Sequence, residues 1–261
     1  MKREAFHEMF SAEDQHWWFV ARRTIMAKIL RSFSPGKVGT ILEIGCGTGG
    51  NLAMLSRFGA VCGMELDDEA RALAESRKIC PVQKGSLPDA IPRGQNFDLI
   101  CLLDVLEHIT DDLGALKAVG NKLAPGGKFL LTVPAYKFMW SAHDVELGHK
   151  RRYRRRELSA LCQQAGFTVR YSTYFNTFLF PVIAGTRLVG RLGGGGGGTD
   201  VAMPPEMLNR LLAKIFAVER FLLPAISLPF GVSLLVVAEN APVADIRRVI
   251  APGEEAEAIK E

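Results

Sequence analysis

Residues 41–51 read Ile-Leu-Glu-Ile-Gly-Cys-Gly-Thr-Gly-Gly-Asn. A short apolar run leads into alternating glycines, and an amphipathic segment follows. This order predicts a β-strand, a glycine turn and a helix. Glycine adopts a positive φ at low cost, and its missing side chain lets a ligand approach the backbone closely. We therefore expect this loop to hold a nucleotide-like group.

A second apolar run, residues 60–64, ends in Glu65, at about the 20-residue distance where dinucleotide-binding folds place an acidic side chain on the ribose hydroxyls. The loop does not have the Gly-x-Gly-x-x-Gly spacing of nicotinamide-binding proteins. Glu43, just before the first glycine, would repel a pyrophosphate but would attract the ammonium group of a methionine moiety. The residues therefore favour S-adenosylmethionine over a nicotinamide cofactor.

These residues resemble the first motif of the class I S-adenosylmethionine-dependent methyltransferases, and the resemblance extends over residues 38–135. Residues 96–108 look like that family's fourth strand and the acidic turn after it. Residues 123–128, Leu-Ala-Pro-Gly-Gly-Lys, predict a helix end and a turn before a fifth strand at 129–133. The whole chain resembles a bacterial subgroup, similar to methyltransferase types 11 and 12, whose substrates are mostly unassigned.

The resemblance implies a Rossmann-like, doubly wound α/β fold. Its sheet would have seven mostly parallel strands, an antiparallel edge strand and a helical insertion between the last two strands, which we expect at 167–174 and 233–239. The alternation of strand and helix patterns also predicts a mostly parallel sheet with helices on both faces. Ligands in such sheets bind beyond the carboxyl ends of the strands.

We predict five consecutive parts: an N-terminal helical cap (1–37), a methyltransferase core (38–174), a hydrophobic helical insertion (175–230), a final core strand (231–240) and a disordered tail (241–261). The cap is expected to hold one helix over 11–33. In the insertion, a glycine linker at 193–198 would precede an amphipathic helix at 206–223. The insertion is too short and interrupted for a membrane span of about 20 apolar residues, which leaves a lid, a membrane-surface face or a dimer contact.

The family resemblance implies S-adenosylmethionine as the cofactor and a set of cofactor-binding residues at the strand ends: Glu43, Gly45, Cys46, Gly47, Gly49, Asn51, Glu65, Leu66, Ser86, Leu87, Asp104, Val105 and His108. Many relatives place an acidic residue against the adenine after the third strand. This chain departs from that pattern and offers the hydroxyl of Ser86. We predict no metal, because the cysteines lack metal-ligand spacing and methyl transfer does not require one.

Residues 134–153 leave the fifth strand at the ligand end and are rich in titratable and aromatic groups, which is typical of a substrate-handling loop. From this segment we take His143, His149 and Tyr153 as catalytic candidates. The substrate-binding candidates add two adjacent tryptophans of the cap, of which we expect one over the pocket and the other in packing: Trp17, Trp18, Tyr136, Trp140, Arg151 and Arg152. The alternative is a solvated basic turn before a helix at 156–165.

The function predicted from these features is direct in-line methyl transfer to an oxygen or nitrogen of a small or lipid-linked acceptor. The hydrophobic insertion favours an acceptor with an apolar part. A catalytically silent S-adenosylmethionine-binding scaffold and an RNA methyltransferase remain alternatives, the latter because of the basic run at 150–156. The net charge of +4 over 261 residues is too small to indicate nucleic acid by itself.

The N-terminal residues lack the apolar stretch of a signal peptide, and the five scattered cysteines are typical of buried thiols in a reducing compartment. We therefore expect a cytoplasmic protein. Peripheral contact with the inner face of the membrane through residues 175–230 is left open, as is a dimer.

Overall fold

The glycine loop follows a central strand of a seven-stranded sheet with the order β3-β2-β1-β4-β5-β7-β6. The computed structural model describes residues 3–92, 94–192 and 202–241. Strands β1 to β5 run parallel, and β7 runs antiparallel to both of its neighbours, β5 and β6. This arrangement confirms the predicted fold class. The strands are β1 (Thr40–Ile44), β2 (Ala60–Glu65), β3 (Val82–Lys84), β4 (Phe97–Leu103), β5 (Leu123–Pro134), β6 (Phe167–Phe175) and β7 (Ser233–Asn240).

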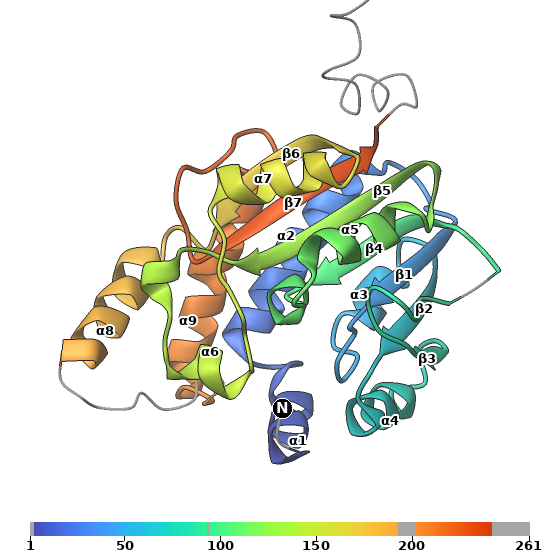
Figure 1. The fold of residues 1–261 in the computed structure, drawn as a ribbon. Helices are drawn as coiled ribbons and strands as arrows, with labels where there is room; N and C mark the ends of the chain where they lie inside the picture. Colours follow the sequence, from blue (N-terminus) through green and yellow to red (C-terminus); the bar gives the residue numbers. More distant parts are fainter. Residues whose placement is uncertain (1–2, 93, 193–201, 242–261) are drawn as a thin grey trace, which may run out of the picture.

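Helices cover both faces of the sheet (Figure 1). On one face lie α5 (Asp112–Gly120) and α7 (Arg155–Gln164), whose apolar side chains join one core cluster. On the other lie α2 (Trp17–Phe33), α3 (Leu52–Leu55) and α9 (Glu206–Ala217). Helix α2 buries Ile25, Met26 and Ile29, at the spacing that places side chains on one helical face.

The remaining helices are α1 (Arg3–Ala12), α4 (Asp68–Ser76), α6 (Ala142–Glu146) and α8 (Phe180–Leu192), with 3₁₀ turns η1 (Leu106–His108), η2 (Lys137–Met139) and η3 (Val218–Phe221). Figure 1 shows α1, α6 and α8 beyond the carboxyl ends of the parallel strands. They therefore lie where a doubly wound sheet binds its ligands.

The expectation of one helix over residues 11–33 was wrong. Helix α1 ends at Ala12 and α2 begins at Trp17. The turn between them lets the side chain of Glu13 point inward, where it accepts a hydrogen bond from Thr48. His16 caps α2, since its Nδ1 accepts a hydrogen bond from the backbone N–H of Trp18 at 3.4 Å.

The expected helix end at 123–128 was also wrong. Helix α5 ends earlier, at Gly120, and β5 already begins at Leu123. The backbone N–H of Phe97 donates to the carbonyl of Lys122 at 2.9 Å, which draws this segment into the sheet. The strand pairing is irregular here, and Gly126 has a positive φ of 74°. Gly126 and Gly127 thus lie in the irregular first part of strand β5 and not at the end of a helix.

The insertion between β6 and β7 contains α8 and α9, as predicted. Phe216 of α9 is fully buried, and its ring centroid lies 6.1 Å from Trp17 and 5.3 Å from Trp18. Both tryptophans therefore pack on one side chain, so the expectation that only one of them would pack was wrong. Other apolar side chains of the insertion are exposed, among them Val182, Leu188, Val189, Met207 and Leu211.

The glycine run at 193–198 and residues 242–261 of the predicted tail lie outside the described residues. Among the described helices, none has the length and apolar character needed to cross a membrane. The lid, membrane-surface and dimer alternatives for the insertion stay predictions. All five cysteines are free thiols.

Phe216→Ala should lower the free energy of unfolding by about 3–5 kcal/mol, the usual cost of truncating a buried phenylalanine. The loss should be visible in urea unfolding followed by tryptophan fluorescence, because both tryptophans contact this ring. Met207→Ala on the same helix is the control. Its side chain is 87% exposed, so we expect a change within about 0.5 kcal/mol. Equal effects of the two substitutions would contradict the packing of α9 on α2.

Candidate active site

A cavity of about 1100 Å³ opens at the carboxyl ends of the parallel strands. Its walls come from the loops that follow β1, β2, β3 and β4, from α1 and α2, and from the segment around α6. Ligand pockets commonly measure about 300–1,000 Å³, so this cavity has room for two small molecules side by side.

The glycine loop forms one wall. Gly45, Gly47 and Gly49 have φ angles of 67°, 55° and 85°, in the region that favours glycine. A Cβ at Gly45 would lie 2.7 Å from Val105, whereas a Cβ at Gly47 would meet nothing within 4 Å. Gly45 is thus required for packing, and Gly47 leaves the backbone open to a ligand.

Glu65 is fixed at this loop by backbone donors. Its Oε2 accepts a hydrogen bond from the N–H of Gly47 at 2.8 Å, and its Oε1 accepts from Leu66 at 2.8 Å and Asp67 at 3.0 Å. The carboxylate lines the cavity next to the loop. This is the place the sequence predicted for a ribose-binding acid.

Glu43 lies behind the cavity wall. It is 1% exposed, and Oε1 accepts a hydrogen bond from Nδ2 of Asn51 at 2.8 Å, while Oε2 has no hydrogen-bond partner among the described residues. Burial raises the pKa of Glu43 to about 8. Asn51, which donates to Glu43, lines the cavity in its place.

Of the predicted cofactor-binding residues, all except Glu43 and Gly49 line the cavity: Gly45, Cys46, Gly47, Asn51, Glu65, Leu66, Ser86, Leu87, Asp104, Val105 and His108. Gly49 is a packing position instead, because a Cβ there would lie 3.1 Å from Ala74.

The turn between α1 and α2 is tied to the glycine loop by a buried ion pair that the sequence did not indicate. Oε1 of Glu13 accepts hydrogen bonds from Thr48 at 2.7 Å and from Arg77 at 2.5 Å. Arg77 also donates from Nε to the Thr48 carbonyl at 2.7 Å. Burial raises the pKa of Glu13 despite these partners. The N-terminal residues are thereby held over the cavity.

A second ion pair, between the buried Arg22 and the partly exposed Asp104, joins α2 to the end of β4. Nη2 of Arg22 lies 2.9 Å from Oδ2 of Asp104 and 3.0 Å from Oγ1 of Thr132, which itself donates to Oδ1 of Asp104 at 3.0 Å. Asp104 has a positive φ of 60°, so the chain turns sharply there. Arg22 lines the cavity and was not among the predicted site residues.

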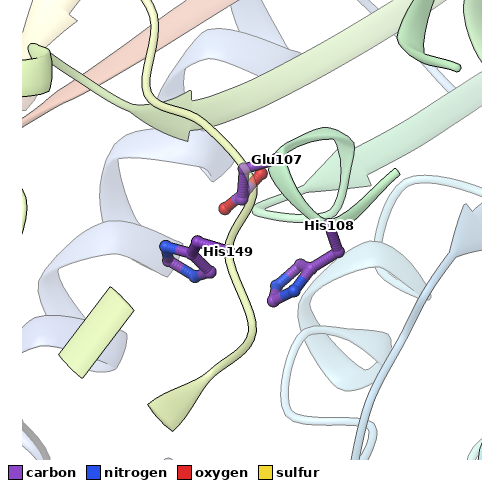
Figure 2. A group of neighbouring side chains, drawn as sticks. All are labelled: Glu107, His108 and His149. Carbon is purple, nitrogen blue, oxygen red and sulfur yellow. The ribbon is translucent and has the colours of Figure 1, made fainter. Parts of the chain in front are cut away.

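Beyond Asp104, the cavity wall carries Glu107, His108 and His149 (Figure 2). Glu107 and His108 come from the turn η1, and His149 comes from the chain after α6. The two imidazole rings have centroids 4.7 Å apart and planes at 82°. Burial, followed by the neighbouring His149, lowers the pKa of His108 to about 4.

Glu107 is completely buried, and neither carboxylate oxygen has a hydrogen-bond partner from another described residue. Burial raises its pKa well above the ordinary value, and Asp104 adds to this effect. The sequence motif that contains Glu107 was recognised, but Glu107 itself was not predicted as a site residue. Its signal was its position directly before His108.

His149 is oriented by Asp144. Nδ1 of His149 lies 2.8 Å from Oδ1 of Asp144, and Arg152 donates to both carboxylate oxygens at 2.7 and 2.9 Å. Burial alone would raise the pKa of Asp144, but the hydrogen bonds from His149 and Arg152 outweigh it and hold the pKa well below its ordinary value. Residues 134–153 are thus not only a loop: Asp144 also caps α6 together with Ser141.

The remaining candidates divide into two groups. His143, Trp17, Trp18 and Arg152 line the cavity, whereas Tyr136, Trp140, Arg151 and Tyr153 do not. The hydroxyl of Tyr153 donates to Asp112 at 3.0 Å, and Arg151 donates to the same carboxylate at 2.5 Å. The ring of Tyr136 stacks on Tyr174 at 5.0 Å.

A family model described as a methyltransferase domain matches residues 16–172. The chain belongs to this methyltransferase family. The methyltransferase is 27% identical over 195 residues to the ubiquinone biosynthesis O-methyltransferase of Pseudomonas fluorescens, with 62% of this chain and 82% of the relative covered. It is 26% identical over 160 residues to a probable S-adenosylmethionine-dependent methyltransferase of Mycolicibacterium smegmatis, covering 60% of this chain and 61% of the relative. This chain thus spans about three fifths of the length of the Mycolicibacterium smegmatis relative.

The fold of the methyltransferase is similar to that of the glycopeptide N-methyltransferase MtfA in complex with S-adenosylmethionine, with a TM-score of 0.53 and 16% identity over 84% of this chain and 94% of MtfA. The prediction of a class I enzyme that uses S-adenosylmethionine is confirmed. The residues fit this donor. The open backbone at Gly47 and the unpartnered buried oxygen of Glu43 behind Asn51 suit an adenosyl group and a cationic methionine end.

Gly47→Arg should abolish binding of S-adenosylmethionine, because its side chain would point into the open cavity. Calorimetric titration measures the loss. Gly36→Arg is a matched control, because Gly36 also has a positive φ, of 98°, and open space around its Cβ position. Gly36 does not line the cavity, so this variant should bind the donor as the wild type does. Donor binding retained in Gly47→Arg would contradict the assigned site.

Glu43→Gln should flatten the dependence of stability on pH. A carboxyl whose pKa rises on folding stabilises the fold most below its unfolded pKa, and this contribution is lost as the pH rises through the folded pKa of about 8. The loss is on the order of 4 kcal/mol for such a shift. Urea unfolding at about pH 5 and about pH 8 should therefore show a smaller decrease for the variant than for the wild type. Parallel profiles would contradict the buried titration of Glu43.

Proposed function

We propose that the methyltransferase transfers a methyl group to a hydroxyl oxygen of a small acceptor that carries an apolar part. The observation that carries this proposal is the continuation of the cavity beyond Asp104. One end offers Glu107, His108 and His149, and apolar and aromatic side chains form part of the remaining lining. An acceptor with a polar reacting end and an apolar body matches this division. The apolar walls include Trp17, Trp18, Phe19, Ile183 and Val232.

The bound donor supplies an electrophilic methyl group on a sulfonium sulfur. As the acceptor oxygen forms its bond to this methyl carbon, the carbon–sulfur bond breaks and its electron pair stays on sulfur. The hydroxyl proton must also leave. The protein therefore has to align the acceptor oxygen and assist the loss of the proton.

The Glu107, His108 and His149 cluster is suited to the second task. His149 has a fixed orientation because Asp144 holds its Nδ1, and Asp144 is itself held by Arg152. His143 also lines the cavity, whereas the hydroxyl of Tyr153 is engaged by Asp112. We therefore assign the assisting role to the cluster and keep His149 as its central residue.

Two observations support an oxygen acceptor with an apolar part. The Pseudomonas fluorescens relative is named as an O-methyltransferase of ubiquinone biosynthesis. In addition, α8 contributes Ile183 and Arg187 to the cavity, while Val182 and Val189 of the same helix are exposed. An apolar chain, including that of a lipid-linked acceptor, has a path from the cavity along this helix. Peripheral membrane contact through the same surface stays a prediction.

The RNA alternative has less support because three of the six basic side chains at 150–156 are engaged within the protein. Arg151 pairs with Asp112, Arg152 pairs with the buried Asp144, and Lys150 donates to Thr110. The alternative of a catalytically silent scaffold also has less support. A protein that only binds S-adenosylmethionine would have no use for the oriented His149 at the acceptor end of the cavity.

The test compares phenolic acceptors with and without an alkyl chain of about four carbons, with product formation followed by mass spectrometry. Each buried methylene contributes about 0.8 kcal/mol, so kcat/KM should rise by at least about tenfold for the alkylated phenol. His149→Ala should lower kcat by roughly 10²-fold or more, as loss of proton-transfer assistance does, without changing the Kd for S-adenosylmethionine.

His7→Ala is the control, because His7 lies outside the cavity lining and contacts Glu69. This variant should keep full activity. Equal turnover of polar amines and alkylated phenols, together with full activity of His149→Ala, would contradict the proposed function.

A further inference from the structure

We propose that Glu107, His108 and His149 bind a divalent transition-metal ion, with Zn²⁺ as the best-suited species, and that the acceptor oxygen takes its open coordination position. The binding of the ion follows from the described residues alone. Its contact with the acceptor rests on the proposed function. The sequence led us to expect no metal, because the cysteines lack metal-ligand spacing and methyl transfer does not require one.

The first argument is the donor set. One ligand atom from each of the three side chains lies within 4.8 Å of the other two. Two imidazoles and one carboxylate, with a fourth position left for water or substrate, form a common catalytic zinc site. Ligand atoms about 2.1 Å from a tetrahedral ion are about 3.4 Å apart, so binding would draw the groups together by at most about 1.4 Å.

The second argument is the buried carboxylate of Glu107. Its oxygens have no hydrogen-bond partner from another described residue, and no part of it is exposed. An unpaired carboxyl group in such a place costs free energy, and proteins tolerate it when a cation or hydrogen-bond donor completes the site. Arg22 and Arg152 are near enough to attract this carboxylate, but neither donates a hydrogen bond to it, so a divalent ion beside Glu107 would supply a direct partner.

The third argument is the support behind His149. Its Nδ1 is engaged by Asp144 at 2.8 Å, which leaves Nε2 for an ion. A carboxylate behind a ligating histidine is the usual arrangement at zinc sites, where it fixes the ring and raises its basicity. Asp144 is in turn fixed by two hydrogen bonds from Arg152, so this support is rigid.

A cation at this position would assist the reaction by lowering the pKa of an acceptor hydroxyl that binds to it, and the proton would pass to water. The oxygen would then attack the methyl carbon as an anion. This deepens the proposed function, because an acceptor with adjacent oxygen groups could fill both the open position and a neighbouring one.

The experiment titrates the chelator-treated full chain with Zn²⁺ by calorimetry and with Co²⁺ by visible absorption. We expect one ion per chain and a d–d absorption band that reports a low-coordinate nitrogen and oxygen site. Glu107→Gln and His108→Gln should each weaken binding by at least about tenfold, with folding checked by thermal unfolding. His7→Ala is the control, because it removes an exposed histidine outside the cluster.

Absence of ion binding by the wild type, or equal binding by Glu107→Gln, would overturn the metal site. Titration of the metal-free protein with S-adenosylmethionine separates this result from the proposed function. Donor binding and full methyl transfer without any ion would leave the proposed function standing and overturn the contact of the ion with the acceptor. Conversely, ion binding lost in Glu107→Gln would support the metal site even if every phenolic acceptor fails.

Discussion

Carboxylates held by specific hydrogen-bond donors fix the ligand end of this sheet. Glu65 accepts three backbone hydrogen bonds at the glycine loop, Glu13 ties the N-terminal turn to the same loop through Arg77, and Asp104 holds Arg22 of α2. Each acid lies within or beside a cavity wall and is compensated by specific donors. Because an uncompensated buried charge is costly, these pairs fix the elements around the cavity in one arrangement. The part of the cavity wall around the glycine loop is therefore held in place by charge interactions as well as by apolar packing.

Glu107 differs from these three acids. It is completely buried, whereas Glu65 and Asp104 are partly exposed, yet no donor from another described residue meets either of its oxygens. The neighbouring imidazoles cannot both compensate it as cations, because burial and mutual repulsion keep His108 neutral at ordinary pH, with a pKa of about 4. The arrangement of Asp144 and Arg152 behind His149 shows that the chain does provide satisfied networks a few ångströms away. This contrast is the reason why we place the proposed ion at the Glu107 end of the cavity.

The sequence was sufficient to predict the fold and most of the residues that line the cavity around the glycine loop, because both depend on local sequence patterns. The glycine loop, Glu65 and Asp104 each follow a strand directly, so strand order alone brings them to one edge. The predictions that were wrong depended on contacts between residues that are far apart in the sequence. Glu13 breaks the expected N-terminal helix in order to reach Thr48, and Leu123 joins the sheet through its pairing with Phe97. Neither contact has a local sequence signal, and the same holds for the meeting of His149 with Glu107 and His108.

This difference explains why the family identifies the donor more readily than the acceptor. The acceptor end is assembled from η1, the chain after α6, the aromatic start of α2 and the insertion helix α8, four segments far apart in the sequence. Small changes in the segments around α6 and α8 alter this end without disturbing the parallel strands that hold the glycine loop. Tyr136 stacks on Tyr174 and does not line the cavity. It therefore supports residues 134–153 from outside the cavity. Under the proposed function, acceptor specificity in this chain therefore depends on tertiary contacts between segments that no local sequence pattern brings together.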